Sequence, residues 1–233
     1  MTPLLMTRDL RKSYIGGDHH PVDVLSGVDL VVDRGEFVAI VGTSGAGKST
    51  LLHLLGALDR PTSGEVSLDG VQYSALPERG LDEIRSRRLG FVFQFHHLLR
   101  EFSALENVMW PLLIRGMESR EARARAETML DRVGLTPRAT HRPHELSGGE
   151  QQRCAVARAV VGEPALLLAD EPSGNLDHAN SHRLHDLLVG VVRETETAAV
   201  VVTHNRHLAD RADRVLLLDD GRLQAATATE AMP

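Results

Sequence analysis

The chain has few of the residues that stabilise disulfide-rich domains or membrane spans. Its 233 residues include one cysteine, Cys154, which excludes an internal disulfide and is expected to be a small, semi-buried apolar side chain. Aromatic residues make up only 3% of the chain. No segment approaches the roughly 18 to 20 consecutive apolar residues of a membrane-spanning helix, so any role at a membrane requires a partner protein.

Positive charge is also in deficit. Lys and Arg number 26 against 32 Asp and Glu, which gives a net charge of −6. A chain without an overall basic field is not expected to bind nucleic acid. The hydrophobic content of 42% is ordinary for one globular domain, or for one domain with a subdomain. The small residues of 225–233 have little to bury and are expected to fray.

A phosphate-binding loop is the strongest feature that is present. The stretch fits the pattern G-x-x-x-x-G-K-[ST] with Gly42, Thr43, Ser44, Gly45, Ala46, Gly47, Lys48, Ser49 and Thr50. An apolar segment at 36–41 predicts a buried strand before it, and 49–55 predicts a helix after it. Glycines let backbone N–H groups face an anion, and the helix N-terminus adds partial positive charge. We expect Lys48 to reach the β- and γ-phosphates and the Ser49 hydroxyl to hold Mg²⁺.

A pair of acids forms the second nucleotide signature. Asp170 and Glu171 follow the apolar segment 165–169, which predicts a buried strand that ends in an acid. The carboxyl ends of parallel strands are where open α/β sheets bind ligands. Carboxylate oxygens suit a hard cation, so we expect Asp170 to hold Mg²⁺ and Glu171 to polarise the attacking water.

Three other polar or aromatic residues belong with this predicted edge. Gln94 and His204 each follow a predicted strand, at 89–93 and 198–203. Tyr14 precedes the loop at a distance that would allow its ring to serve as a platform for a base, although one tyrosine is a weak signal. The short apolar strands alternate with helices, which predicts a parallel sheet covered on both faces.

Residues 95–162 have a different pattern, typical of a helical insert in an α/β core. Residues 104–113 are apolar at helical spacing, with Pro111 expected to bend or end the helix. Residues 119–133 predict a helix capped by Ser119 and stopped by Gly134, and 181–194 predict a later one. The predicted domains are therefore a core at 1–94, a helical subdomain at 95–162, and the rest of the core at 163–233.

The stretch from Leu146 to Arg153 resembles the signature sequence of ABC-transporter ATPases. It reads Leu-Ser-Gly-Gly-Glu-Gln-Gln-Arg, and physically it is a helix start capped by Ser147, with Gly148 and Gly149 allowing close approach of the backbone. The helix is expected from Glu150 through residue 159. A second anion site in one chain makes most sense if two copies share each nucleotide.

The resemblance covers nearly the whole chain and implies a RecA-like P-loop NTPase core with a parallel sheet and an inserted α-helical subdomain. It implies ATP and Mg²⁺ as ligands, and a head-to-tail dimer in which Ser147 and Gly149 close the ATP held on Lys48 of the other copy. It also implies a role for each remaining motif residue: adenine stacking for Tyr14, the Q-loop for Gln94, the Walker B aspartate for Asp170, the catalytic glutamate for Glu171, the D-loop for Asp177 and the switch histidine for His204.

Four segments are similar to the ATPase subunits of lipoprotein-releasing ABC systems: 51–56, 94–108, 141–146 and 171–177. That similarity implies a peripheral protein on the cytoplasmic face of the inner membrane. It also implies permease subunits that dock near His96, His97, Leu98, Leu99 and Phe102. For Leu98 and Phe102, the core of the helical insert is an equally good explanation.

Several alternatives stay open. ATPases of macrolide or peptide exporters and of cell-division-associated systems share nearly every motif. A soluble ABC protein of DNA repair would need a long coiled coil between loop and signature, and one of translation would usually carry two cassettes. A small-molecule kinase explains the loop but leaves residues 146–153 without a purpose. The pairs His19–His20 and His141–His144 lack further ligands at metal spacing and are expected in loops.

Overall fold

The chain folds into two compact units. The structure is a computed structural model that describes residues 3–17 and 19–231, and the first unit comprises residues 1–85 and 198–233. The second unit comprises residues 86–197. The predicted domain boundaries after residues 94 and 162 stay predictions. The second unit differs from the predicted helical subdomain because it also includes the strands before and after its helices.

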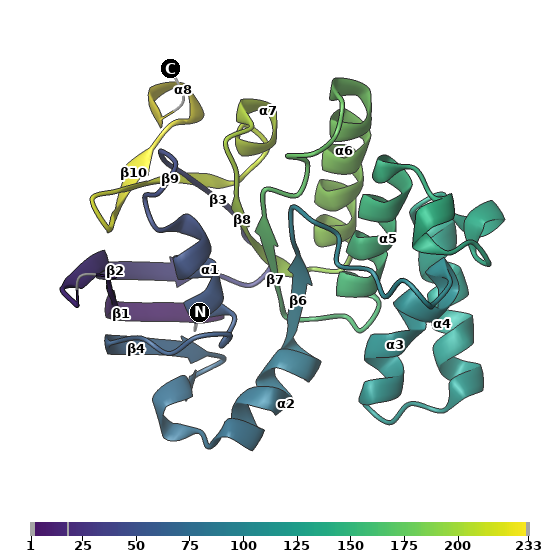
Figure 1. Cartoon of the computed structure of the whole chain (residues 1–233), viewed down its shortest axis with the longest axis horizontal. Helices are drawn as coiled ribbons and strands as arrows, with labels where there is room; N and C mark the ends of the chain where they lie inside the picture. Colours follow the sequence, from purple (N-terminus) through teal and green to yellow (C-terminus); the bar gives the residue numbers. More distant parts are fainter. Residues whose placement is uncertain (1–2, 18, 232–233) are drawn as a thin grey trace. The chain divides into compact units, whose positions relative to one another are not determined.

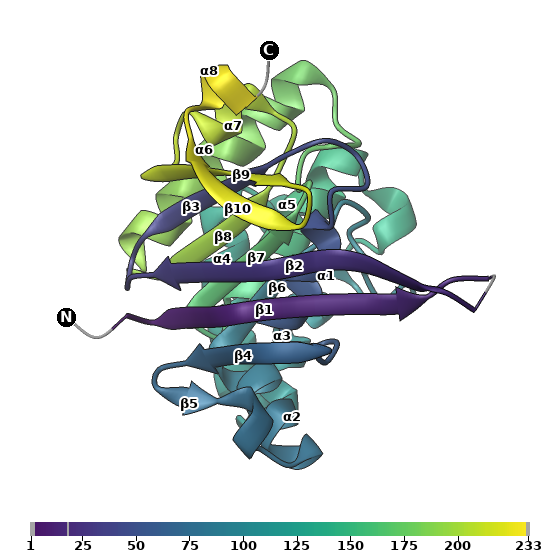
Figure 2. The same cartoon turned by 90° about the vertical axis from the view of Figure 1, so that its left-hand side faces the viewer.

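The first unit contains an antiparallel sheet with the strand order β2-β1-β4-β5. These strands are β1 (Leu5–Ile15), β2 (Pro21–Val32), β4 (Ser63–Leu68) and β5 (Val71–Gln72). Figure 2 shows β2, β1 and β4 side by side. The register between β1 and β2 shifts after Thr7, whose hydroxyl donates to Val28 O at 2.9 Å and accepts from Leu30 N at 2.9 Å. The side chain thus satisfies backbone groups that the shift would leave unpaired.

The same unit holds the parallel strands of the nucleotide-type core. Strand β3 (Phe37–Val41) pairs in parallel with β8 (Ala198–Val202) and with β9 (Arg214–Asp219). Every residue of β3 and β8 is buried, as expected for uncharged, β-branched strands covered on both faces. Helix α1 (Lys48–Leu55) follows β3 and buries four leucines, which confirms the predicted strand, loop and helix.

The second unit consists of two parallel strands and a group of helices. Strands β6 (Leu89–Val92) and β7 (Leu166–Asp170) pair in parallel. Helices α3 (Ala104–Ile114), α4 (Ser119–Arg132) and α5 (Gly148–Val160) pack on one another (Figure 1), and α6 (His178–Glu194) packs on α5. Cys154 is fully buried in α5, where burial raises the pKa of its thiol to about 12. Helix α2 (Glu78–Arg88) spans the boundary between the units.

Helices α3, α4 and α6 differ from the prediction at one of their ends. Helix α3 continues past Pro111 to Ile114, because buried Leu112 holds its last turn against the core. The cap of α4 is Glu118 and not Ser119, since the Glu118 carboxylate accepts from the backbone N–H groups of residues 120 and 121. Helix α6 begins at His178 with Asp177 as its cap, three residues earlier than predicted. Gly134, with φ of 67°, follows the end of α4 as predicted.

The expectation that 225–233 frays is wrong for the described part. Strand β10 (Arg222–Ala226) pairs antiparallel with β9, and α8 (Ala228–Ala231) follows it. Ala228 is buried against Ala39, Val41 and Ala209. A side chain as small as that of Ala228 can be buried here because its neighbours are small as well. Met232 and Pro233 lie outside the described residues.

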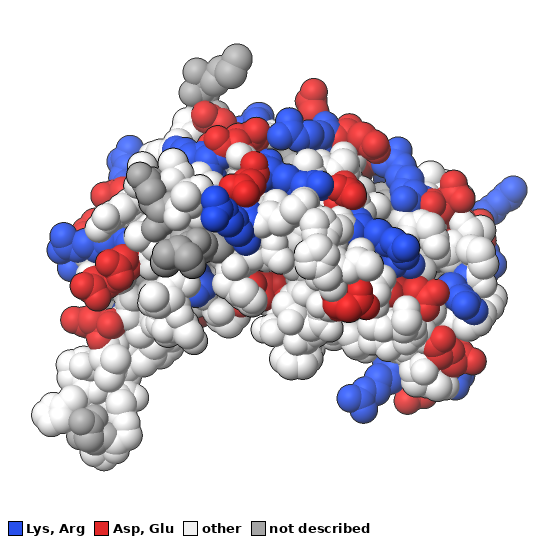
Figure 3. Space-filling view, turned by 90° about the horizontal axis from the view of Figure 1, so that it is seen from above, with Lys and Arg blue, Asp and Glu red and all other residues white. Residues whose placement is uncertain are grey.

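The surface and the helices agree with the composition. Figure 3 shows acidic and basic side chains interspersed on the face in view, with no field of one sign. Among residues 3–17 and 19–231, no helix combines the length and apolar character needed to cross a bilayer.

Candidate functional site

The phosphate-type loop lies between β3 and α1 and depends on its glycines. Gly42, Gly45 and Gly47 have φ of 154°, 83° and 96°. A Cβ on Gly42 would lie 2.4 Å from the carbonyl oxygen of Leu218, and one on Gly47 would lie 2.9 Å from that of Val24. Any side chain at these two positions would force the backbone apart, so the pattern is a steric requirement of the fold.

The N-terminus of α1 is open to an anion. Gly47 is its N-cap, no side chain caps the helix, and its first turn contains no acid. Its N-terminal N–H groups, and the partial positive charge there, are therefore not used by another side chain. The Lys48 ammonium donates to the carbonyl oxygens of Gly42 and Thr43, each at 2.8 Å, which folds it over the loop. Ser49 is exposed beside it.

His204 lies at the same sheet edge as this loop. Strands β3 and β8 are parallel neighbours with Ile40 opposite Val202, so the loop and His204 both follow the carboxyl ends of paired strands. The His204 side chain is exposed, and Asn205 caps the short helix α7 (Arg206–Ala209) by accepting from Leu208 N at 3.2 Å. The prediction that the two segments lie at one edge is confirmed.

Tyr14 lies in β1, and its hydroxyl is held by a hydrogen bond. The hydroxyl donates to Asp59 Oδ2 at 2.8 Å, while the residue stays 41% exposed. The Lys12 ammonium lies 4.8 Å from the centre of its ring. Lys12 and Asp59 were not predicted from the sequence, because 47 positions separate them and no motif joins them.

In the second unit, Gln94, Asp170 and Glu171 lie at the carboxyl ends of two paired strands. Val92 of β6 is opposite Ala169 of β7, so the segments that follow leave from the same edge. The Gln94 side-chain amide donates to Asn175 Oδ1 at 3.1 Å, and the Asn175 side-chain amide donates to the backbone carbonyl oxygen of Gln94 at 3.1 Å. Glu171 has φ of 44°, and its carbonyl accepts from Gly174 N at 3.0 Å. A non-glycine residue held in this region is a strained conformation of the kind found at functional sites.

Ser147 caps α5 as predicted, and the helix begins at Gly148, two residues earlier than expected. The Ser147 hydroxyl accepts from Glu150 N at 3.3 Å and donates to Glu150 Oε2 at 2.9 Å, and Ser147 N donates to the same carboxylate at 2.8 Å. The bond from Ser147 N lowers the pKa of Glu150. Arg138 also donates to Glu150, at 3.2 Å. Its positive charge partly neutralises the carboxylate at the N-terminus of α5.

The two signature glycines have different surroundings. Gly148 is exposed, whereas Gly149 is buried and a Cβ there would lie 2.9 Å from Asn180 Oδ1 of α6. Asp177 caps α6 by accepting from Asn180 N at 2.9 Å and from its side-chain amide at 2.7 Å. These bonds lower the pKa of Asp177. The predicted nucleotide residues Gly149 and Asp177 thus meet at Asn180.

Three side chains of helix α5 form hydrogen bonds with the segment around Gln94. Gln152 donates to Phe93 O at 2.9 Å, and Arg158 donates to the carbonyl oxygens of His96 and His97 at 2.8 and 2.7 Å. Gln151 hydrogen-bonds to the His96 ring. A cavity of about 160 Å³ lies between these parts, and it is lined by Gln94, Phe95, His96, Gly148, Gln151, Gln152, Pro172, Asn175 and Leu176.

The predicted docking residues are only partly on the surface. Leu98 is 6% exposed and belongs to the core of the helices, so its assignment to a docking surface is wrong. Leu99 is 37% exposed, His97 is exposed, and Phe102 packs on the exposed Trp110 with ring centres 5.3 Å apart. Phe95 is 65% exposed and was not predicted, although an aromatic residue next to Gln94 was the available signal. We call the exposed or half-buried rings of Phe95, His97, Phe102 and Trp110 the exposed aromatic patch.

Histidine and acidic side chains do not cluster as in a closed metal centre. No group of three or more His, Cys, Asp or Glu residues in the described part of the chain is arranged to hold a metal ion. The assignment of Ser49, Asp170 and Gln94 to Mg²⁺ stays a prediction; each has an oxygen donor of the kind that a hard cation prefers.

Comparison with known proteins agrees with this set of motifs. The family model described as ABC transporter matches residues 25–174. The lipoprotein-releasing system ATP-binding protein LolD of Bordetella pertussis is 55% identical over 222 residues, covering 95% of this chain and 96% of that protein. LolD of Geobacter metallireducens is 53% identical over 97% of this chain and 100% of that protein, and LolD of Legionella pneumophila (strain Lens) is 51% identical over 95% and 97%.

A solved structure extends the match to the fold. The ATP-binding cassette MJ0796, in a dimeric post-hydrolysis state bound to ADP and Pi, is 38% identical with a TM-score of 0.87. The match covers 95% of this chain and 97% of that one. A family model matches residues 25–174, near full-length relatives are 51 to 55% identical, and a solved cassette shares the fold, so the chain belongs to the ATP-binding proteins of the ABC transporter family.

Proposed function

We propose that this chain hydrolyses ATP as the peripheral subunit of a lipoprotein-releasing ABC transporter, on the cytoplasmic face of the inner membrane. The observation that carries the ATP part is the uncapped N-terminus of α1, with Lys48 folded over a loop that tolerates only glycine at two positions. The lipoprotein part is supported by relatives named for that function, which are 51 to 55% identical over nearly their whole length.

The phosphate loop supplies charge neutralisation. The backbone N–H groups of residues 43–48 and the Lys48 ammonium bind the β- and γ-phosphates, whose growing negative charge they stabilise during transfer. Tyr14 stacks on the adenine. The remaining nucleotide contacts of the loop come from Gly42, Thr43, Ser44, Gly45, Ala46, Gly47, Ser49 and Thr50.

Mg²⁺ fits the oxygen donors available. The Ser49 hydroxyl, the Asp170 carboxylate and the Gln94 amide oxygen would hold the ion, which would offset phosphate charge. Glu171 accepts a proton from the attacking water, whose oxygen forms the new bond to the γ-phosphorus as the bond to ADP breaks. His204 and Gln94 orient the water and the γ-phosphate.

A second copy of the chain completes each site. Ser147, Gly148 and Gly149 present the N-terminus of α5 to the γ-phosphate held by the other copy, and Asp177 lies beside them through Asn180. The dimeric cassette of 38% identity supports a pair of copies. The exposed aromatic patch is where permease subunits dock, because exposed apolar rings next to a functional segment are typical of binding surfaces.

Replacing Glu171 tests the chemistry. Glu171→Gln keeps the size of the side chain but removes the proton acceptor, so ATP binding and dimer formation should persist while turnover falls by about a hundredfold or more. Glu163→Gln is the matched control, since Glu163 also has a left-handed φ, of 49°, and precedes β7. Unchanged turnover in Glu171→Gln would remove Glu171 from the reaction.

Replacing Ser147 tests the shared site. Ser147→Ala should impair hydrolysis while single copies bind ATP normally, because Ser147 acts on the nucleotide of the other copy. Ser103→Ala is the control, since Ser103 and Glu106 form the same capping box on α3. Both variants lose about 1 kcal/mol of stability through the cap, but only Ser147→Ala should lose turnover. Equal loss of binding and turnover would contradict the shared site.

Purification from membranes tests the transport function. The chain, solubilised with its membrane, should bring down integral permease subunits, and substitution of Phe95 and Trp110 by Ser should release them. Stimulation of ATP turnover by a lipoprotein added to that complex supports lipoprotein release. Stimulation by a macrolide or peptide instead would favour an exporter, and recovery of no permease would favour a soluble ATPase.

A further inference from the structure

The hydroxyl of Tyr14 belongs to a hydrogen-bonded cluster in the first unit. It donates to Asp59 Oδ2, and it also hydrogen-bonds to Thr50 in the first turn of α1. The Lys12 ammonium donates to Asp59 Oδ1 at 2.8 Å and to the carbonyl oxygen of Arg60 at 2.7 Å. The cluster thus joins strand β1 to both ends of the helix that follows the phosphate loop.

The ion pair between Lys12 and Asp59 is partly buried. The Lys12 side chain is 12% exposed and that of Asp59 is 32% exposed. Burial acts to raise the pKa of Asp59, but the hydrogen bonds from Lys12 and Tyr14 outweigh it, so the net pKa is lowered. The carboxylate is therefore held ionised, with both of its oxygens engaged.

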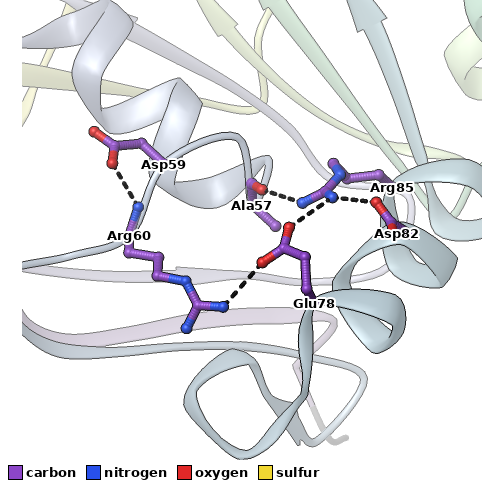
Figure 4. A network of polar contacts seen from close by, with 6 residues as sticks. All are labelled: Ala57, Asp59, Arg60, Glu78, Asp82 and Arg85. Carbon is purple, nitrogen blue, oxygen red and sulfur yellow. Dashed lines mark hydrogen bonds and ion pairs between the residues drawn. The ribbon is translucent and has the colours of Figure 1, made fainter.

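The turn that carries Asp59 is itself fixed. Figure 4 shows Arg60 N donating to Asp59, and the Arg60 guanidinium donating to Glu78 Oε2 at 3.0 Å. Arg85 donates to Ala57 O at 2.6 Å and to Glu78 Oε1 at 3.0 Å, which ties both sides of the turn to α2. Because the support is rigid, Asp59 can hold the Tyr14 ring in one orientation.

The Lys12 ammonium covers one face of the Tyr14 ring. It lies 4.8 Å from the centroid of the Tyr14 ring, over one face, which is a cation–π contact. The residue is nevertheless 41% exposed. One face is thus covered by a cation and the hydroxyl is tied down, so a flat aromatic ligand has a single face on which to stack.

We propose that Lys12 and Asp59 are positioning residues that hold the Tyr14 ring so that its open face receives the adenine base of ATP. This inference rests on the proposed function, in which Tyr14 stacks on the base. Neither residue touches the nucleotide. Their contribution is to remove the motion of the ring before binding, so that less freedom is lost when the base stacks.

Affinities for ATP and for inorganic tripolyphosphate, measured by calorimetry on the full chain, separate this role from a structural one. Lys12→Met, Asp59→Asn and Tyr14→Phe should each weaken ATP binding by about threefold to tenfold, the loss expected when a held side chain must be immobilised on binding. Tripolyphosphate has no base, so its affinity should not change. Intact tripolyphosphate binding also shows that the variant is folded.

A double variant and a matched control sharpen the result. Tyr14→Phe with Asp59→Ala should bind ATP no more weakly than Asp59→Ala alone, because Asp59→Ala already removes the hydrogen bond from the Tyr14 hydroxyl. Asp69→Asn is the control: Asp69 pairs with Arg34 in the same unit, its side chain is 31% exposed, and its loss should leave both affinities unchanged.

The outcomes distinguish this inference from the proposed function. If Tyr14→Ala leaves ATP affinity unchanged, the base contact itself is wrong. If Tyr14→Ala weakens ATP binding but Lys12→Met and Asp59→Asn do not, only the positioning role is overturned. Equal weakening of ATP and tripolyphosphate in the Lys12 and Asp59 variants would show general damage to the loop and would also overturn it.

Discussion

Replacing Arg158 by Met should release the segment after Gln94 from helix α5. The Arg158 guanidinium donates at 2.7 and 2.8 Å to the carbonyl oxygens of His97 and His96, and burial lowers its pKa. Hydrogen bonds from a charged donor contribute about 1.5–3 kcal/mol each, and the cost of burying the charge offsets part of their sum. His97 also has φ of 46°, a conformation that costs about 1 kcal/mol or more and persists only under restraint.

We therefore expect Arg158→Met to lower the free energy of unfolding by about 2–4 kcal/mol. For a chain of this size that corresponds to a fall of about 5–15 °C in Tm. Urea and thermal unfolding measure the global effect, and hydrogen exchange at the amides of Leu98 and Leu99 measures the local one. The local exchange should accelerate more than the global loss explains, because the segment loses its two anchoring bonds.

Arg153→Met is the control for this prediction. Arg153 lies on the same helix, is also partly buried, and donates to a single carbonyl, that of Val133, at 3.1 Å. Its loss should cost about 1 kcal/mol and leave exchange at Leu98 and Leu99 unchanged. Equal loss of stability in the two variants, with equal exchange at residues 98–99, would contradict the prediction. The two hydrogen bonds from Arg158 would then contribute less than the roughly 2–4 kcal/mol expected.

Three further changes have expected outcomes. Asn107 is fully buried and donates to the carbonyl oxygens of Leu99, Phe102 and Ser103, so Asn107→Leu should cost about 2–4 kcal/mol in urea unfolding. Gly64→Ala should lower Tm well beyond Gly70→Ala, because both have positive φ but only at Gly64 does a Cβ lie 2.2 Å from a backbone oxygen, against open space at Gly70. The thiol of Cys154 should react with a disulfide reagent at pH 8 only on unfolding. Because burial raises its pKa to about 12 while the unfolded thiol ionises near 9, its contribution to stability should be lost as pH rises from about 9 toward 12.

The parts of the site that the sequence predicts are those encoded by neighbouring residues. The loop at Gly42 to Thr50 is a contiguous pattern that can be recognised from the sequence alone, although Gly42 and Gly47 are required by the distant backbone of Leu218 and Val24. Strands β3 and β8 contain no charge, and β7 contains none before Asp170. The parallel pairing of β3 with β8, and of β6 with β7, then brings the ends of each pair to one edge. Ser147 was predictable as a cap because its partner, Glu150, is three positions away.

The parts that escaped prediction depend on long-range pairing or on competition between neighbours. Lys12 meets Asp59 across 47 positions, and Arg158 meets His97 across 61, and such pairs have no periodic signature. Glu118 caps α4 in place of Ser119 because its longer side chain reaches the N–H groups from one position earlier. Asp177 likewise starts α6 before Ser181, which a hydrophobic pattern cannot detect in a polar first turn.

The two helix N-termini that the sequence marks as anion sites are not equivalent in the structure. Helix α1 has no side-chain cap and no acid in its first turn, so its N–H groups are available in a single copy of the chain. Helix α5 already uses its N3 N–H for Ser147, and Glu150 sits in its first turn with only Arg138 to offset the charge. An anion is therefore bound more strongly by α1 than by α5. A nucleotide should fill the loop first, and α5 should contribute only when a second copy brings it to a phosphate that is already held.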